Sequence, residues 1–124
     1  MNRTFQQSYH IPGTLTANID IRFTAHTNMS LVHVSAVASN DSDATIAVGT
    51  SADTDGFITA AVIGDSQVPA EFELADFDGA LLTDAGKEYP RISDGDVVVV
   101  TLDFDGASGT AGQDVTIVLT FTEG

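Results

Sequence analysis

The chain has 124 residues and no cysteine, and 18 Asp and Glu outnumber four Lys and Arg, which gives a formal net charge of −14. This length predicts one domain, and the lack of cysteine excludes disulfides, thiolate chemistry and cysteine-based zinc sites. Because so acidic a surface repels phosphate groups, we expect no nucleic acid and no membrane among its partners.

Residues 1–13 differ from the rest of the chain, since they are polar, carry two aromatic residues and end in the turn signal Pro12-Gly13. We interpret them as an extended N-terminal arm that leads into a β domain formed by residues 14–124. Arms of this kind pack on a neighbouring subunit or fray in solvent. The sequence leaves both outcomes open.

The segments after the arm alternate between apolar and polar residues, as half-buried β-strands do. In LTANIDIRFTA the apolar set is Leu15, Ala17, Ile19, Ile21, Phe23 and Ala25. In SLVHVSAVAS the residues expected to face the core are Val32, Val34, Ala36 and Ala38. Further strands are indicated by ATIAVGT, FITAAVIG, AEFELADF, VVVVTLDF and DVTIVLTF.

The composition of these segments agrees with their period, because Val, Ile, Thr and Phe fill them and Gly, Asp, Asn and Pro separate them. Roughly seven or eight short strands at this spacing are typical of a sandwich or barrel. The sequence therefore predicts an all-β fold, an antiparallel β-sandwich, with a jelly roll as the first choice. An immunoglobulin-like sandwich is the alternative, although the Cys pair and Trp of true immunoglobulin domains are missing.

The run Val97-Val98-Val99-Val100 places apolar groups on both faces of one strand. A strand of an antiparallel sandwich normally exposes one face to water. Either a loop covers the outer face, with Leu81 and Leu82 as candidates, or another subunit does. The second alternative predicts a homo-oligomer, with Val97 and Val99 in the contact.

The tetrapeptide DFDG occurs twice, at 76–79 and 103–106. Asp-Gly is favoured where a hairpin needs a positive φ, so we interpret both copies as strand ends with a core-facing Phe. A calcium site is the alternative, because calcium binds loop carboxylates and carbonyls. Its ligands would be Asp53, Asp55, Asp94 and Asp96, and the protein would then be a calcium-dependent carbohydrate-binding module of a tail fibre or cell-surface protein.

Catalytic signals are weak throughout the sequence. Gly64-Asp65-Ser66 resembles the nucleophile block of GDS-type esterases, but a serine hydrolase needs a histidine base and none follows His33. A hydrolase that uses paired carboxylates, such as Asp103 and Asp105, is a further alternative. We expect no enzyme, no catalytic residue and no cofactor.

Several features together resemble the head-decoration, or cement, proteins of tailed bacteriophages. They are the arm TFQQSYHIPGTL, the Thr-, Ala- and Val-rich strands, the small acidic turns, and the blocks LVHVSAVASNDSDATIAVGTSADTDGF and AVIGDSQVPAEFELADFDG. The resemblance implies a virion protein on the capsid exterior, commonly a trimer, that bridges subunits of the major capsid protein. The contact residues would then be Thr4, Phe5, Gln6, Gln7, Tyr9 and His10 of the arm, together with Val97 and Val99.

Overall fold

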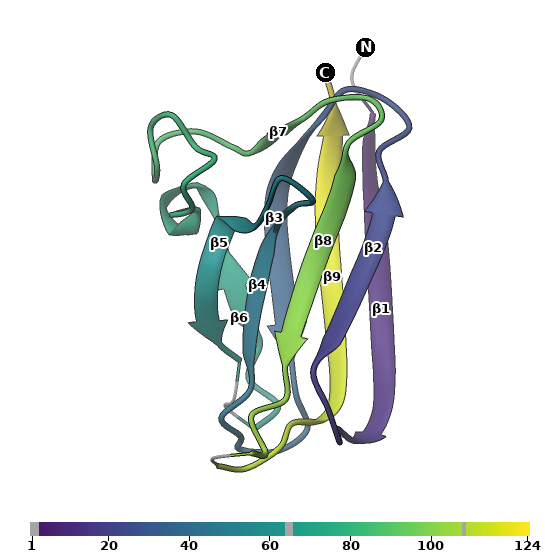
Figure 1. Ribbon diagram of the computed structural model, residues 1–124, viewed down its shortest axis with the longest axis vertical. Coiled ribbons are helices and arrows are strands. Elements are labelled where there is room, and N and C mark those ends of the chain that lie inside the picture. The colour runs from purple at the N-terminus through teal and green to yellow at the C-terminus, as the bar shows by residue number, and fades with distance from the viewer. Residues whose placement is uncertain (1–2, 64–65, 108) are drawn as a thin grey trace.

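The regular elements of the described chain are β-strands and a single turn of 3-10 helix (Figure 1). The computed structural model describes residues 3–63, 66–107 and 109–124. In chain order the elements are β1 (Thr4–Thr14), β2 (Ile19–Thr24), β3 (Met29–Val37), β4 (Thr45–Thr50), β5 (Asp53–Val62), β6 (Ala70–Phe72), the 3-10 helix η1 (Leu74–Asp76), β7 (Arg91–Ile92), β8 (Val97–Asp103) and β9 (Gln113–Glu123). Among the described residues, no helix has the length and apolar character needed to cross a membrane.

The strands form two sheets, which we call the β1 sheet and the β2 sheet. The β1 sheet has the order β1-β9-β3-β6, with β7 also paired to β3, and the β2 sheet has the order β2-β8-β4-β5. Strand pairing is antiparallel and nested, because β1 pairs with β9, β2 with β8, β3 with β6 and β4 with β5. A long hairpin wrapped into two sheets, the jelly roll, pairs its strands in this way. The predicted all-β antiparallel sandwich is confirmed.

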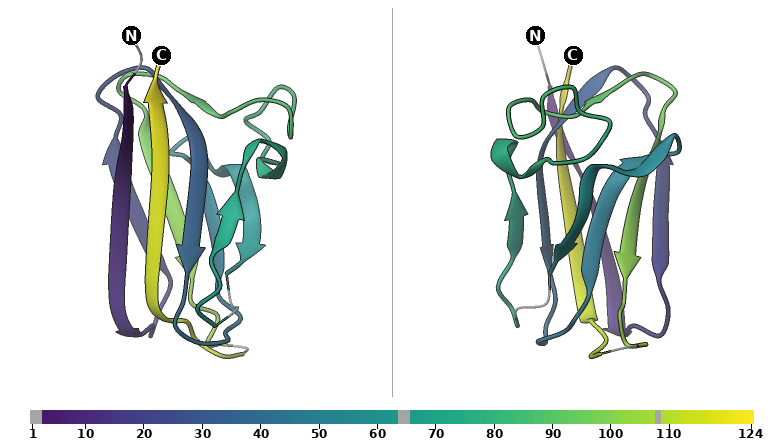
Figure 2. Two further views of the ribbon diagram at one scale, coloured as in Figure 1. Left: turned by 180° about the vertical axis from the view of Figure 1, so that it is seen from behind. Right: turned by 60° about the vertical axis from the view of Figure 1, so that its left-hand side comes forward.

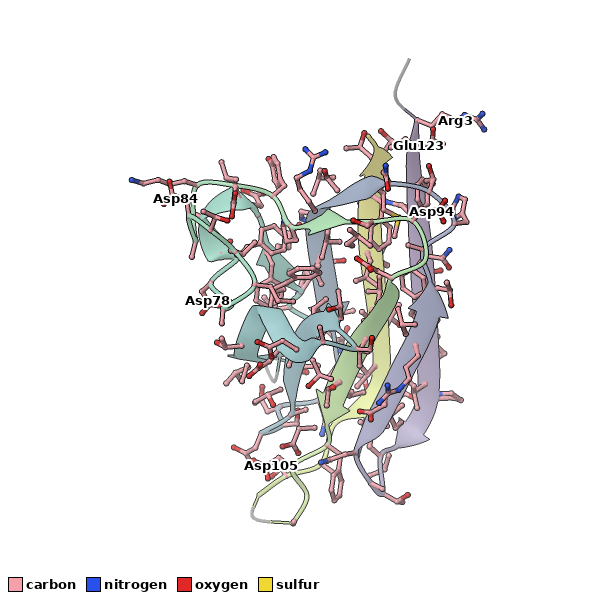
Figure 3. The ribbon with its side chains drawn as sticks, turned by 45° about the horizontal axis from the view of Figure 1, so that its top comes forward. Arg3, Asp78, Asp84, Asp94, Asp105 and Glu123 are labelled. Carbon is pink, nitrogen blue, oxygen red and sulfur yellow. The ribbon has the colours of Figure 1, made fainter. Side chains whose placement is uncertain are left out.

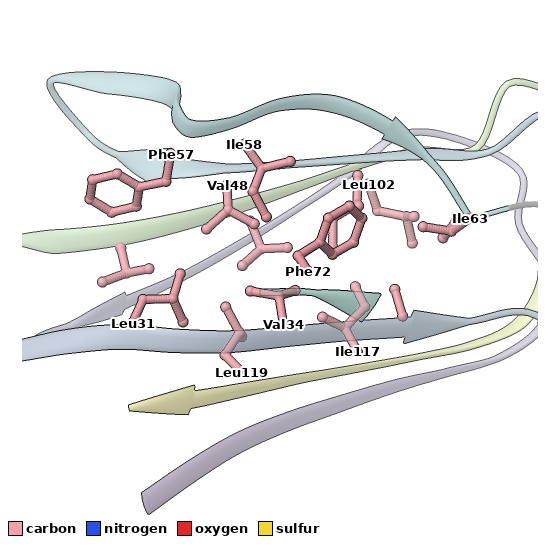
Figure 4. Close-up of a cluster of buried hydrophobic side chains, with 14 of the residues drawn as sticks. Leu31, Val34, Val48, Phe57, Ile58, Ile63, Phe72, Leu102, Ile117 and Leu119 are labelled. Atoms are coloured by element: carbon pink, nitrogen blue, oxygen red, sulfur yellow. The ribbon is translucent and has the colours of Figure 1, made fainter. Parts of the chain in front are cut away.

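The core lies between the sheets (Figure 4). Leu31 and Val34 of β3 and Leu119 of β9 face Val48 and Leu102 of the β2 sheet, and all five side chains are fully buried. Each such side chain contributes about 1.5–3 kcal/mol to folding through its removal from water. The inward positions recur at every second residue, so the alternation in the sequence is the alternation between core and surface.

Residues 4–13 lie in the sandwich, which corrects the expectation of an arm that precedes its first strand. They belong to β1, which pairs with β9 from Thr4↔Thr122 to Ile11↔Val115 and forms the edge of the β1 sheet (Figure 2, left). The reason is that β9 would otherwise expose a full row of backbone hydrogen-bonding groups, and that Phe5, Tyr9 and Ile11 pack against the core. The predicted boundary after residue 13 falls inside this strand.

A β-bulge changes which residues of β3 face inward. The pairing of β3 with β9 shifts between Leu31↔Phe121 and His33↔Thr120. Leu31 and Val34 are consequently both buried, whereas Val32 is half-buried and lies on the outer face. The expectation that Val32 faces the core is wrong, because one extra residue in a strand moves the following side chains to the other face.

The outer face of β8 is covered by the chain itself. Val99 is 0% exposed although its neighbours Val98 and Val100 are the ones that join the core. It pairs with Gly49 of β4, and a Cβ at Gly49 would lie 2.1 Å from the Asp53 carbonyl oxygen. The start of β5 therefore bends over this part of the β2 sheet. Val99 is not available to another subunit, and Val97 is half-buried.

Candidate interaction surface

Apart from Asp114 at one end of β9, the outer face of β1, β9 and β3 carries no carboxylate, and we call it the acid-free face. Its outward residues are Thr4, Gln6, Ser8 and His10 of β1, Thr116, Val118, Thr120 and Thr122 of β9, and Ser30, Val32, His33, Ser35 and Val37 of β3. The three strands lie side by side in Figure 2 (left). Most of these side chains are short hydroxyl or β-branched groups.

Hydrogen bonds across the strands order the side chains of this face. The Gln6 Nε2 donates to the Thr120 hydroxyl at 3.2 Å, and His10 Nδ1 lies 2.8 Å from the Thr116 hydroxyl oxygen. Both pairs sit opposite each other in the β1–β9 register. Cross-strand pairs of this kind stabilise a sheet by about 0.2–1 kcal/mol each. The face is accordingly preorganised, which lowers the entropy lost when a partner binds.

Acidic residues border the acid-free face, and three of them at its margin form ion pairs or hydrogen bonds. The carboxylate of Glu123 lies 3.8 Å from the Arg3 guanidinium, and that of Glu71 lies 3.5 Å from His33 Nε2. The carboxylate of Asp114 accepts the Gly13 N–H at 2.6 Å and the hydroxyl of Ser39 at 3.1 Å. These two hydrogen bonds, the one from Gly13 first, lower the pKa of Asp114.

Most other carboxylates lie in the loops and at the two ends of the sandwich. Figure 3 shows Asp78 and Asp84 in the loop between β6 and β7, Asp94 and Glu123 near one end, and Asp105 at the opposite end. The chain has a net charge of −14. A second acidic macromolecule that approaches it therefore meets the least electrostatic repulsion at the acid-free face. Charge distribution therefore makes this face the best candidate for a macromolecular contact.

The six contact residues expected in the arm divide between the two sides of β1. Thr4, Gln6 and His10 are exposed on the acid-free face, whereas Phe5, Gln7 and Tyr9 are half-buried on the inner side. The inner aromatic rings belong to the sandwich, and their burial raises the pKa of Tyr9. The ring of Phe5 lies 5.4 Å from that of Phe121, and the ring of Tyr9 lies 6.5 Å from that of Phe23.

Sequence reasoning missed the contribution of β9 and β3 to this surface. The outward row of β9 is visible in DVTIVLTF as alternating Thr and Val, but nothing local shows that it lies beside Gln6 and Ser8. Those pairs join residues more than a hundred positions apart in the chain, as in the hydrogen bond between Gln6 and Thr120. The signal that could have predicted the face is the near absence of Asp and Glu from these strands in an otherwise acidic sequence.

The four aspartates considered as calcium ligands are not gathered into one site. Asp53 and Asp55 lie close together. A hydrogen bond with Asp53 and, secondly, the charge of Asp53 raise the pKa of Asp55. Asp96 instead accepts the Ser93 N–H at 3.0 Å, and the Asp94 N–H binds the Asn28 side chain at 2.9 Å. Within residues 3–63, 66–107 and 109–124, no three His, Asp or Glu side chains are placed to hold a metal ion.

The first DFDG motif closes the core through close backbone contact. Phe77 is fully buried, and the Asp78 carboxylate accepts the N–H and the hydroxyl of Thr59 at 3.1 and 3.2 Å. A Cβ at Gly79 would lie 2.1 Å from the backbone of Gly56, so glycine is required there by space. A turn with positive φ at this Asp-Gly pair, expected from the sequence, is not what the structure uses.

The second DFDG motif ends β8 differently. Its Phe104 is half-buried against the core, and the positive φ falls on Asp105, at 44°, whose N–H binds the Asp103 carboxylate at 3.0 Å. Of the Asp-Gly pairs, Asp94-Gly95 is the one whose glycine has a positive φ, 92°. Both motifs therefore serve structure, but only the second ends a strand as predicted, because the first begins at the end of the 3-10 helix η1.

The serine of the GDS block and one of the surface hollows are both tied to loop structure. Gly64 and Asp65 lie outside the described residues, and the Ser66 hydroxyl donates to the Ser39 carbonyl at 3.1 Å. An open hollow of about 340 Å³ lies beneath the loop that carries Tyr89. Glu88, which lines the hollow, accepts two backbone N–H groups of this loop, so its carboxylate holds the loop in place.

Among solved structures, the chain is similar in fold to a chain of the "Cyanophage Pam1 capsid asymmetric unit". The TM-score is 0.58 at 15% sequence identity, and the match covers 99% of this chain and 85% of that chain. No protein-family model and no curated protein matches the sequence. At this identity the likeness establishes a shared fold.

Proposed function

We propose that this protein is a structural component of a phage virion that decorates the capsid exterior and bridges neighbouring subunits of the major capsid protein. The observation that carries the proposal is the likeness of fold to a chain of a phage capsid over 99% of this chain. The resemblance of the sequence to decoration proteins points the same way. The proposal includes no catalytic residue and no cofactor.

The mechanism we propose is mechanical. A sandwich with a continuous core resists deformation, and the acid-free face supplies a contact surface in which Gln6 and His10 are already held by β9. Contacts that are individually weak stabilise a shell when they are repeated around it. The carboxylates at the ends and in the loops, turned away from the shell, would keep particles apart by repulsion.

The trimer expected for such proteins also belongs to the proposal, and the resemblance alone carries it. Light scattering of the purified protein tests this part. A particle of three times the 12.9 kDa chain mass supports it. Any other stoichiometry, both free in solution and on the shell, removes the trimer from the proposal without touching the capsid contact.

Co-sedimentation with shells of the major capsid protein from the same phage tests the capsid contact. In the test variant, Ser35→Glu and Val118→Glu place two charges side by side on the acid-free face. The matched control, Thr16→Glu with Thr24→Glu, adds the same charge at exposed positions of the other sheet and its preceding loop. We expect wild type and control to sediment with the shells and the test variant to bind about tenfold more weakly or not at all. Failure of the wild-type protein to bind, or equal binding by both variants, would overturn the proposal.

A further inference from the structure

Three of the four sheet edges carry features that block the addition of another strand. Natural edge strands are protected by charges, bulges or shortness. At the edges of the β2 sheet, β2 carries Asp20 and Arg22, and β5 begins with Asp53 and Asp55 and pairs with β4 through two register shifts. At the far edge of the β1 sheet, β6 has three residues, one of them Glu71.

The edge formed by β1 lacks these features over most of its length. It has 11 residues, none of them Asp, Glu, Lys or Arg, and its register with β9 is unbroken from Thr4 to Ile11. Pro12 follows only at the end of this regular part. An unprotected regular edge of this length is a template for strand addition.

The backbone groups that face outward from β1 can be assigned. The Glu123 N–H donates to the Arg3 carbonyl at 2.8 Å, which makes Arg3 and Glu123 a hydrogen-bonded pair. Such pairs alternate with non-hydrogen-bonded ones along an antiparallel ladder. The N–H and C=O groups of Phe5, Gln7 and Tyr9 therefore point to β9. The groups that point away from the sheet, which we call the outward amides, belong to Thr4, Gln6, Ser8 and His10.

We propose that β1 pairs antiparallel with β1 of a second copy of this chain, about a twofold axis at Gln7. In this register Thr4 lies opposite His10 of the copy and Gln6 lies opposite Ser8, so every outward amide faces another one. Roughly eight backbone hydrogen bonds result, since each hydrogen-bonded pair makes two. A shift by two residues in one direction places Pro12, which cannot donate, opposite Thr4. The same shift in the other direction leaves His10 opposite none of the four residues that carry outward amides.

Side chains and charge favour the same occupant. In this register Phe5 lies opposite Tyr9 of the copy on the inner side, and aromatic cross-strand pairs are among the favourable ones. Two chains of net charge −14 repel each other at most orientations. Pairing through the uncharged β1 keeps their carboxylates apart, and it brings Arg3 of each chain to the end of the copy's strand where Asp114 binds Gly13.

The twofold contact is separate from any trimer contact, because an interface about a threefold axis joins two different surfaces of the chain. It would link neighbouring trimers rather than build one. A single pair of edge strands is a small interface, so we expect self-association that is weak and depends on concentration.

Amide hydrogen exchange, measured at rising protein concentration, tests the edge directly. We expect the outward amides to exchange fast in dilute protein and at least about tenfold more slowly in concentrated protein. The amides of Phe5, Gln7 and Tyr9, which bind β9, should be protected at every concentration. Exchange of the outward amides that is independent of concentration would overturn the proposal, and it would leave the capsid contact untouched.

Two charge variants test the register by analytical ultracentrifugation. Gln6→Glu with Ser8→Glu places like charges opposite each other, and we expect the dimer to weaken about tenfold. Gln6→Lys with Ser8→Glu places opposite charges together only in the register centred on Gln7, and we expect self-association at least equal to wild type. Equal behaviour of the two variants would overturn this register. Thr16→Glu with Thr24→Glu serves as the control of equal added charge for Gln6→Glu with Ser8→Glu, and circular dichroism confirms that each variant is folded.

Discussion

Truncation of the two DFDG phenylalanines separates the structural roles of two identical motifs. Phe77 is 0% exposed and meets Tyr89 edge to face at 6.3 Å. Its carbonyl accepts the Gly86 N–H at 2.9 Å, so it joins the loop between β6 and β7 to the core. Phe104 is half-buried at the end of β8. Phe77→Ala and Phe104→Ala therefore make the same chemical change in different surroundings.

Burial sets the expected magnitudes. Removal of a fully buried phenylalanine ring costs about 4 kcal/mol, because the lost transfer free energy adds to that of the cavity left behind. For the half-buried ring we expect about 1.5 kcal/mol. An unfolding entropy near 2.1 cal/mol/K per residue gives about 0.26 kcal/mol/K for a chain of this size, so the melting temperature should fall by about 15 °C and about 6 °C respectively.

Differential scanning calorimetry measures both shifts, and urea titration gives the free energy of unfolding independently. Phe104→Ala is the matched control, since it removes the same ring from the same tetrapeptide. If the two variants lose equal stability, or if Phe104→Ala loses more, the assignment of Phe77 to the core and Phe104 to its border is wrong.

Four further predictions concern single features. Gly79→Ala should cost about 3 kcal/mol of unfolding free energy, because its Cβ would overlap the backbone of Gly56; an unchanged urea midpoint contradicts this. Val99→Asp should unfold the chain, as seen by circular dichroism, since Val99 is fully buried. If the variant instead stays folded and loses only self-association, Val99 is a subunit contact after all. The pKa of Asp114 is lowered in the folded protein, so its contribution to stability is present above the unfolded value of 3.8 and is lost as the pH falls through the folded pKa. The melting temperature of Asp114→Asn should therefore fall less over that pH range than the melting temperature of wild type. Calcium should leave the melting temperature unchanged, and a large rise would favour the carbohydrate-binding alternative.

The contact surface shows how far local sequence carries a prediction. The residues expected in the arm included Thr4, Gln6 and His10, which do lie on the acid-free face, because polar side chains in an acidic chain marked the segment as unusual. Val99 is predicted as a contact from a different pattern, a run of four valines, and it is buried. Its cover depends on how β5 bends over Gly49, and no pattern near Val99 contains that information.

The sequence by itself determined that this protein is an antiparallel β-sandwich, since alternation of period two is a local property that states which side chains leave water. It also favoured a structural role for DFDG and Asp-Gly over a calcium site, although it did not show which backbone conformation each copy adopts. The tertiary structure decided that Thr4–Thr14 is an edge strand beside β9 and that the bulge at Leu31–His33 turns Val32 outward. Both depend on pairing between segments far apart in the chain, where the free energy comes from contacts that neither segment can make alone.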